Sequence, residues 1–305
     1  MSRAGGARQE QSRRERIAAQ RAAARRAQTR NRLLIAGGAI VAVVAIVLGF
    51  ALTSGHSSGG GSGGSGGGTV PTGSALDHIV TTTTTVPVAT SDSVGAGTAS
   101  SNPTSITGAP LTSGGKPEML YMGAEYCPYC AAERWGMVVA LSRFGTFSGL
   151  AATHSAATDG AGNAEPYPNT ATWTFAKSTF TSKYLTFTPV EMFTNVPDPS
   201  TGGYTALQAP TAQQQALIGK YDANGSIPFI DFGNKYLSVG ASYDPAVLQG
   251  LTWSQIADDL HNPASPVAKG VLGTANYMTA AICGLTGNQP ASACTPAVQA
   301  LQGKL

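Results

Sequence analysis

The sequence predicts an α/β domain in its second half, preceded by a single transmembrane helix and a disordered linker. Three observations lead to this prediction. An apolar run follows an arginine-rich N-terminus, a tract of Gly, Ser and Thr comes next, and the remaining residues alternate between strand-like and helix-like patterns. Strands that alternate with helices are typical of a layered α/β architecture.

The charge of the chain is concentrated at its beginning. Residues 1–32 hold ten Arg and two Glu, a net charge of +8, whereas the remaining nine Lys or Arg and fourteen Asp or Glu give −5. Such a basic, alanine-rich segment can bind nucleic acid or anionic lipid. Because an apolar run follows directly, we interpret it as a cytoplasmic segment that rests on acidic headgroups, and we expect no nucleic-acid partner.

Residues 33–53, LLIAGGAIVAVVAIVLGFALT, contain no charged side chain. A helix of this length is about 31 Å long, which matches the ~30 Å hydrocarbon core of a bilayer. The positive-inside rule then predicts a single-pass protein of the cell membrane, with a cytoplasmic N-terminus and an extracytoplasmic C-terminal domain. The alternative is a cleaved signal peptide, but the charged region is long for one and no clean small-x-small site follows.

Residues 54–115 are expected to form a flexible linker that lets an outer domain move several nanometres from the bilayer. The stretch SSGGGSGGSGGG is followed by five consecutive Thr and by scattered Pro and Ser. Segments so poor in apolar residues cannot offset the entropy lost on ordering. A chain of about 60 such residues has an r.m.s. span of ~45 Å.

The folded domain is expected over residues 116–262, with a helical extension over 263–305. Its first strand is the apolar run around MLYMGA, and Ala131, Trp135, Val138 and Leu141 fall on one face of the helix that follows. Turn and capping residues mark the ends of the later elements. Further strands are predicted over 150–158 and 184–193 and on both sides of a Gly233-Asn234 turn, and further helices over 209–221, over 245–262 after an Asp244 cap, over 266–283 and in the tail.

The motif YCPYC, residues 126–130, contains two of the four cysteines and lies where a predicted strand meets a predicted helix. At such a junction, unpaired backbone N–H groups and the positive end of the helix dipole favour a thiolate. The arrangement therefore predicts a lowered pKa for Cys127, which would be nucleophile and leaving group, and a shielded Cys130 that resolves the mixed disulfide. An extracytoplasmic location permits disulfide chemistry.

Two other interpretations of this pair are a zinc site and a static disulfide. Zinc usually takes four ligands, but Cys283 and Cys294 form no second C-x-x-C, and His154 and His261 are isolated. We therefore expect no metal and no other cofactor. A static disulfide in so tight a loop would contribute little loop-closure stabilisation.

The order of strand, C-x-x-C, helix and a later SIPF before a hairpin resembles the thioredoxin superfamily over residues 116–262. This resemblance implies that Pro228 is a cis-proline that lies against the cysteine pair and shapes the edge where substrate docks. About a hundred residues separate Cys127 from Pro228, which implies an insertion like that of periplasmic disulfide oxidoreductases. The anchor, the stretch GAEYCPYCAAERW and the C-terminal cysteines are together similar to the membrane-anchored domain-of-unknown-function family 929, whose activity is unassigned.

Several neighbours are expected to tune the pair, although no acid stands where thioredoxin has its buried carboxylate. Arg134, one turn beyond Cys130, could stabilise a thiolate, but it could also be an ordinary solvated helix residue. Tyr126 stands where thioredoxin has Trp. The tuning residues are Glu125, Tyr126, Pro128, Tyr129 and Arg134.

The two remaining cysteines, Cys283 and Cys294, would close a loop of about twelve residues. A disulfide there is worth ~3 kcal/mol in the chain-entropy model, so we interpret the pair as a structural staple. The alternative is a second redox pair that relays electrons to the first.

These observations predict a membrane-tethered thiol–disulfide oxidoreductase with Cys127, Cys130 and Pro228 at its site. Its partners would be exported cysteine-containing proteins or a membrane redox partner, besides the bilayer around residues 33–53. The alternative function is a thioredoxin-fold binding module whose cysteine pair is inert. Oxidation and reduction of a substrate are both compatible with the sequence.

Overall fold

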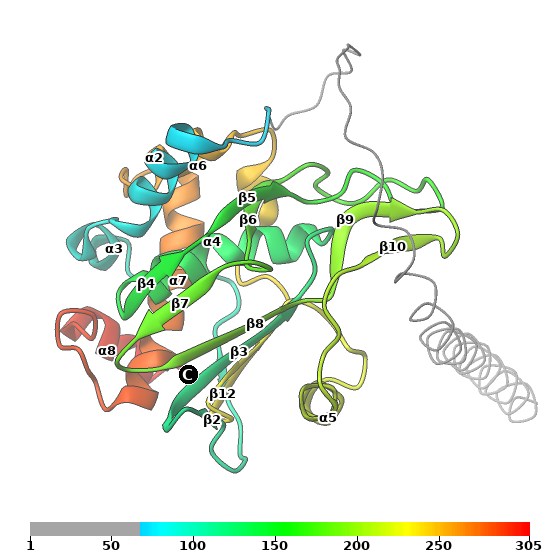
Figure 1. Cartoon of the computed structure of the whole chain (residues 1–305). Coiled ribbons are helices and arrows are strands. Elements are labelled where there is room, and N and C mark those ends of the chain that lie inside the picture. Colours follow the sequence, from blue (N-terminus) through cyan, green and yellow to red (C-terminus); the bar gives the residue numbers. More distant parts are fainter. Residues whose placement is uncertain (1–67) are drawn as a thin grey trace, which may run out of the picture. The chain divides into compact units, whose positions relative to one another are not determined.

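The computed structural model describes residues 68–305 (Figure 1). The expected cytoplasmic segment, the transmembrane helix and the first part of the linker, up to residue 67, lie outside the described residues. Among the helices of the described part, none is both long enough and apolar enough to cross a membrane.

The centre of the fold is a mixed six-stranded sheet (Figure 1). The strand that precedes the YCPYC motif pairs with three others: two run antiparallel to it and one runs parallel. Along one path the strands are β1 (Thr104–Ser105), β12 (Tyr236–Val239), β11 (Phe229–Phe232), β3 (Lys116–Gly123) and β2 (Thr112–Ser113), and β8 (Thr186–Glu191) pairs with β3 in parallel.

Alternate residues of β3 enter two separate cores, because successive side chains of a strand point to opposite faces. Met119 and Tyr121 belong to the larger core, on the side of the long helices. Leu120 and Met122 belong to a smaller core that includes Leu217 of α5 (Ala212–Tyr221). The sheet is therefore covered by helices on both faces.

Helix α4 (Pro128–Ser142) begins directly after the motif and is buried on every side from Cys130 to Leu141. The sequence predicts an apolar stripe on one face, but α7 (Pro266–Thr286) covers the outer face as well. Gly136 allows this close approach, since a Cβ there would lie 3.0 Å from the Cγ2 atom of Thr274. The helix that carries the cysteines is thus held between the sheet and α7.

The expected linker is partly wrong, because residues 73–94 form two helices. These are α2 (Gly73–Thr84) and α3 (Val88–Val94). Ile79 of α2 is 3% exposed and belongs to the main core, and the Nδ2 atom of Asn276 donates to the carbonyl oxygens of Ser91 and Gly95. The threonine tract is compatible with a helix because the hydroxyl groups of residues 81–85 donate to carbonyl oxygens four residues earlier.

The helix predicted over residues 245–262 is in fact two. A 3-10 helix, η2 (Pro245–Leu248), follows the predicted Asp244 cap, whose Oδ1 atom accepts from the N–H of Ala246 at 3.0 Å. Gly250 then adopts a φ of +78°, which ends the helical path. A capping box at Thr252 and Gln255 starts α6 (Trp253–Asp259).

Between β3 and α5 the chain forms three short hairpins, the second of which lies between the two strands of the first, and α8 (Pro296–Gln302) closes the C-terminus. Of the hairpin strands, the sequence predicts only the one near residues 150–158. We refer to the third hairpin, residues 193–206, as the arm. The hairpins pair β4 (Gly145–Ser148) with β7 (Thr179–Ser182), β5 (Ala151–His154) with β6 (Ala171–Thr174), and β9 (Phe193–Asp198) with β10 (Gly203–Ala206).

Candidate active site

The cysteine pair lies at the junction between β3 and α4. Cys127 is the N-cap of α4, with an extended backbone at φ −72° and ψ 119°, and Pro128 occupies the first turn, where its missing N–H is not needed. The Sγ atom of Cys127 accepts a hydrogen bond from the N–H of Cys130 at 3.1 Å. The sulfur therefore takes the place that a Ser or Asp oxygen usually takes at a helix start.

The two thiols are free and differ in their environment. Cys127 is 4% exposed, whereas Cys130 is fully buried. Burial opposes ionisation of Cys127, but hydrogen bonds from the Cys130 thiol and N–H, together with the charge of Arg134, lower its pKa below the ordinary thiol value. Burial, and then the hydrogen bond to Cys127, raise the pKa of Cys130. The environment thus favours the thiolate at Cys127 and the protonated thiol at Cys130.

Pro228 directly follows Ile227, the residue that contacts the pair. The carbonyl oxygen of Ile227 is 4.0 Å from the Sγ atom of Cys127, and the Ile227–Pro228 peptide bond is cis. Ile227 packs against a small cluster formed by Ala124, Cys127 and Cys130. Residues a hundred positions apart therefore meet at one sulfur atom.

Arg134 is fully buried beside the pair, so the expectation of a solvated helix residue is wrong. Its Nε and Nη2 atoms donate to the two carboxylate oxygens of Glu191 at 2.9 and 2.7 Å, and Nη2 also donates to the carbonyl oxygen of Ala124 at 2.6 Å. Its Nη1 atom has no hydrogen-bond partner among the described residues. A paired, desolvated guanidinium thus supplies positive charge next to both sulfurs.

Glu191, the partner of Arg134, is the residue of this cluster that the sequence did not predict. It ends β8 and stands opposite Gly123 in the parallel register with β3. Burial raises its pKa, while the charge of Arg134 opposes that rise. A charged residue at the end of the apolar strand TFTPVE was the available signal, although its partner lies 57 positions away.

The aromatic residues of the motif join the site to the arm and to the loop 155–169. The ring of Tyr126 stacks on the ring of Tyr204 with centroids 4.0 Å apart, and the hydroxyl of Tyr204 donates to Glu165 at 2.5 Å. Tyr129 is 40% exposed and packs edge-on against Tyr167. Of the other expected tuning residues, Glu125 accepts from the Thr174 hydroxyl at 2.5 Å.

The other candidate ligands and cysteines lie outside this site. Cys283 and Cys294 are joined in a disulfide between the end of α7 and the segment before α8. The Nδ1 atom of His154 is 2.8 Å from the carbonyl oxygen of Ser155. Among residues 68–305, no group of three His, Cys, Asp or Glu side chains is arranged to hold a metal ion.

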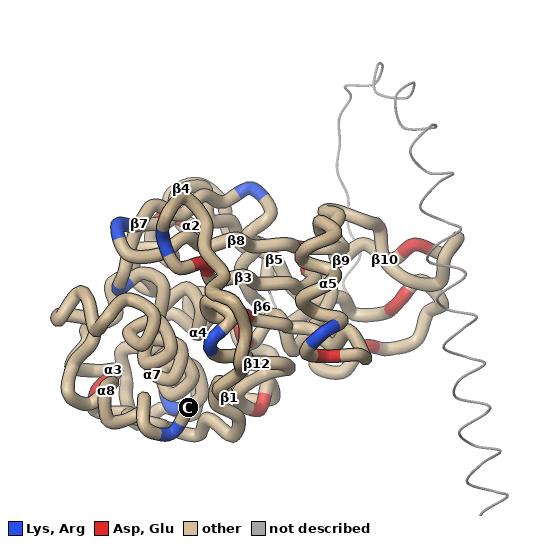
Figure 2. The backbone as a smooth tube through the Cα atoms, turned by 90° about the horizontal axis from the view of Figure 1, so that it is seen from below, with Lys and Arg blue, Asp and Glu red and all other residues tan. Residues whose placement is uncertain are grey.

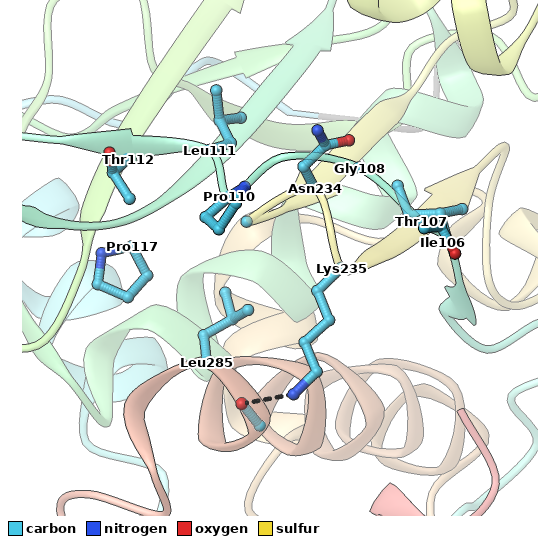
Figure 3. Close-up of a pocket in the computed structure, with 12 residues that line it drawn as sticks. Ile106, Thr107, Gly108, Pro110, Leu111, Thr112, Pro117, Asn234, Lys235 and Leu285 are labelled. Carbon is cyan, nitrogen blue, oxygen red and sulfur yellow. Dashed lines mark hydrogen bonds between the residues drawn. The ribbon is translucent and has the colours of Figure 1, made fainter.

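A cavity of about 410 Å³ lies at the opposite end of β3 (Figure 3). Pro117 at the start of β3, the Asn234 turn and Leu285 of α7 contribute to its wall, and no cysteine does. Lys235 reaches across to donate to the carbonyl oxygen of Gly284 at 3.0 Å. The cavity is therefore separate from the cysteine pair.

The fold and the site can be compared with known proteins. No curated protein and no solved structure matches the chain. Residues 102–284 match a family described as "Domain of unknown function (DUF929)". This range holds β3, the cysteine pair, Arg134, Glu191 and Pro228. Since it covers more than half of the chain, the protein belongs to the DUF929 family.

Proposed function

We propose that this protein is a thiol–disulfide oxidoreductase in which Cys127 exchanges with the cysteines of exported proteins and Cys130 resolves the mixed disulfide. The observation that carries this proposal is the hydrogen bond from the N–H of Cys130 to the Sγ atom of Cys127 at 3.1 Å. It stabilises negative charge on the first sulfur at a helix start, where nucleophilic cysteines are activated.

We further propose that the domain has a thioredoxin-like fold with an insertion. The strand order β8-β3-β11-β12 supports this, with β8 and β3 parallel and the next two pairs antiparallel. The connection between α4 and β8, which includes two of the short hairpins, would be the insertion. The proximity of Ile227 to Cys127 supports the docking role proposed for the edge at Pro228.

In the dithiol form, the Cys127 thiolate attacks one sulfur of a substrate disulfide. A bond forms between Cys127 and that sulfur, the substrate S–S bond breaks, and the other substrate sulfur leaves as a thiolate that takes up a proton. Cys130 then loses its proton and attacks the Cys127 sulfur, which releases the second substrate thiol. The pair is oxidised, the substrate is reduced by two electrons, and the reverse sequence oxidises a substrate dithiol.

Turnover requires a second thiol–disulfide couple to restore the pair, and we propose a membrane redox partner for this role. The sequence of residues 1–53 supports placement at the membrane with the domain outside. In that compartment the substrate would be an exported protein.

A second candidate is a binding module with an inert pair. It is favoured by the 4% exposure of Cys127, which leaves a partner little direct access to the sulfur. The two candidates differ in whether covalent adducts form on Cys127.

The decisive experiment is Cys130→Ala in the full-length protein, expressed in the native host. A variant without its resolving thiol should accumulate mixed disulfides on Cys127, seen as higher bands that disappear on reduction. Cys127→Ser with Cys130 intact is the matched control and should show none. Equal band patterns for the two variants at normal protein levels would support the binding module instead.

A further inference from the structure

We propose that the arm and the loop 155–169 form the substrate-docking surface, and that it binds an extended, cysteine-containing polypeptide segment with basic residues. This inference rests on the proposed function and specifies its substrate class. It is carried by the position of the arm, by its exposed apolar side chains and by its charge.

The arm is fixed beside Cys127 by direct contacts. The N–H of Glu125 donates to the carbonyl oxygen of Phe193 at 2.9 Å, and the ring of Phe193 lies 6.2 Å from that of Tyr126. The carbonyl oxygen of Tyr126 in turn accepts from the N–H of Ala156 at 2.9 Å. The residue before the nucleophile therefore touches both the arm and the loop.

Exposed apolar side chains are found in the YCPYC motif and in and next to the arm. In the part of the chain that the structure describes, four large hydrophobic residues are exposed, and all four belong to this region. Single exposed hydrophobic residues are common, but their confinement to one region indicates an interaction surface. They are Tyr129 at 40% in the motif, Phe193 at 36% and Val196 at 57% in the arm, and Leu207 at 40% directly after it.

The charge of this surface has one sign. Neither the arm nor the loop 155–169 contains a Lys or Arg, whereas together they carry Asp159, Glu165 and Asp198. Figure 2 shows acidic and no basic positions around β9 and β10. Such a surface attracts cationic partners and raises their association rate at low ionic strength.

This surface favours a bound polypeptide in an extended conformation. Among the described strands, β9 and β10 pair only with each other. The carbonyl oxygens of Phe193 and Gly203 already accept from Glu125 and Gly160, so a further strand can pair with the rest of these edges. An unfolded polypeptide presents its backbone and its apolar side chains together. A folded partner would have to match the arm by shape.

The test measures thiol exchange of the full-length protein with three activated disulfides, each of which releases thiopyridone when Cys127 attacks. Two are peptides of equal length whose single Cys carries a thiopyridyl group, flanked by Phe and Leu together with either Lys or Glu. The third is dithiodipyridine, which has no peptide. We expect the basic peptide to react about tenfold faster than the acidic one at low salt, and this preference to vanish at high salt.

Two variants test the surface itself. Phe193→Ser should slow the reaction of both peptides about fivefold more than it slows the reaction of dithiodipyridine. The double variant Glu165→Gln, Asp198→Asn should remove most of the preference for the basic peptide. Its matched control, Asp77→Asn with Asp258→Asn, removes two carboxylates from α2 and α6 and should keep the preference.

The outcomes distinguish a failure of the proposed function from a failure of the proposed docking surface. If dithiodipyridine does not react with Cys127, the proposed function fails and the docking surface with it. If dithiodipyridine reacts normally but the variants of the arm and loop react with both peptides at the rates of the wild type, only the proposal of a docking surface is overturned. A preference for the acidic peptide would also overturn it.

Discussion

Arg134 and Glu191 form a two-bond ion pair with a shortest N–O distance of 2.7 Å, and both side chains are fully buried. Arg134 lies one helical turn beyond Cys130. The pair joins the helix that carries the cysteines to the end of β8. Breaking a buried pair on one side leaves an uncompensated charge, whereas replacing both partners by apolar residues can leave stability unchanged. Double and single substitutions of this pair can thus separate its effect on the pKa of Cys127 from its effect on the free energy of unfolding.

The first prediction concerns Arg134→Met together with Glu191→Met. We expect this double variant to keep a free energy of unfolding close to that of the wild type and to raise the pKa of Cys127, because the positive charge beside the thiolate is lost. Glu191→Gln alone should instead lower the free energy of unfolding by about 3–5 kcal/mol. Urea unfolding and the pH profile of Cys127 alkylation measure the two effects. An unchanged alkylation profile would contradict the proposed role of Arg134.

The second prediction uses the position of Cys127 as the N-cap of α4. Ser is a good N-cap and Ala is a poor one, so Cys127→Ser should keep the stability of the wild type while Cys127→Ala loses about 1 kcal/mol. Both variants should lose thiol exchange completely. Thermal unfolding and reaction with dithiodipyridine give the two readouts. Equal stability of the two variants would show that the sulfur does not cap the helix.

The third prediction concerns Glu133, which is fully buried on α4 and accepts from the N–H and hydroxyl of Ser242 at 2.9 and 2.7 Å. Burial raises its pKa to about 7, although these hydrogen bonds oppose the rise. Because the folded pKa exceeds the unfolded one, the protonated carboxyl contributes stability that is fully present below the unfolded pKa. That contribution is lost as the pH rises through about 7.

Glu133→Gln removes this titration. Relative to the wild type, the variant should therefore gain roughly 3 kcal/mol as the pH rises from 4.5 to 8, in the direction that the pKa shift dictates. Unfolding free energies of both proteins at a series of pH values measure the difference. A difference that does not change with pH would mean that the carboxyl titrates alike in the folded and unfolded chains.

The fourth prediction tests whether α2 belongs to the folded domain. Ile79 is 3% exposed and packs in the main core, so Ile79→Ala should lower the free energy of unfolding by about 2–4 kcal/mol. Asp77→Ala, at an exposed position of the same helix, should change it by less than ~0.5 kcal/mol. Chemical denaturation of the two variants makes the comparison. If Ile79→Ala is as mild as its control, α2 does not contribute to the core.

The elements nearest the cysteines could be predicted because their signals are local. β3 is a continuous apolar run, and the residues on one face of α4 recur at helical spacing. The helices α2 and α3 could not be predicted in this way. A threonine tract is typical of a linker, and the burial of Ile79 depends on a core formed by distant segments. Similarly, the strands of the short hairpins hold four to six residues each and mix polar with apolar side chains.

The site residues also divide into those with local sequence signals and those that only the fold brings together. The positions of Cys127 and Cys130 at a helix start follow from neighbouring residues. The ion pair of Arg134 depends on the parallel register between β3 and β8, which brings the end of one strand beside the end of the other. The stack of Tyr126 on Tyr204 depends on a hairpin more than sixty residues further along the chain. No pattern within a short window carries that information.

The burial of α4 on every side from Cys130 to Leu141 determines which part of this helix a partner can contact. From Cys130 to Leu141 the helix offers no lateral surface, whereas Tyr129 in its first turn is exposed. A partner that binds next to the cysteine pair therefore meets α4 at the phenol ring of Tyr129 and not along the sides of the helix.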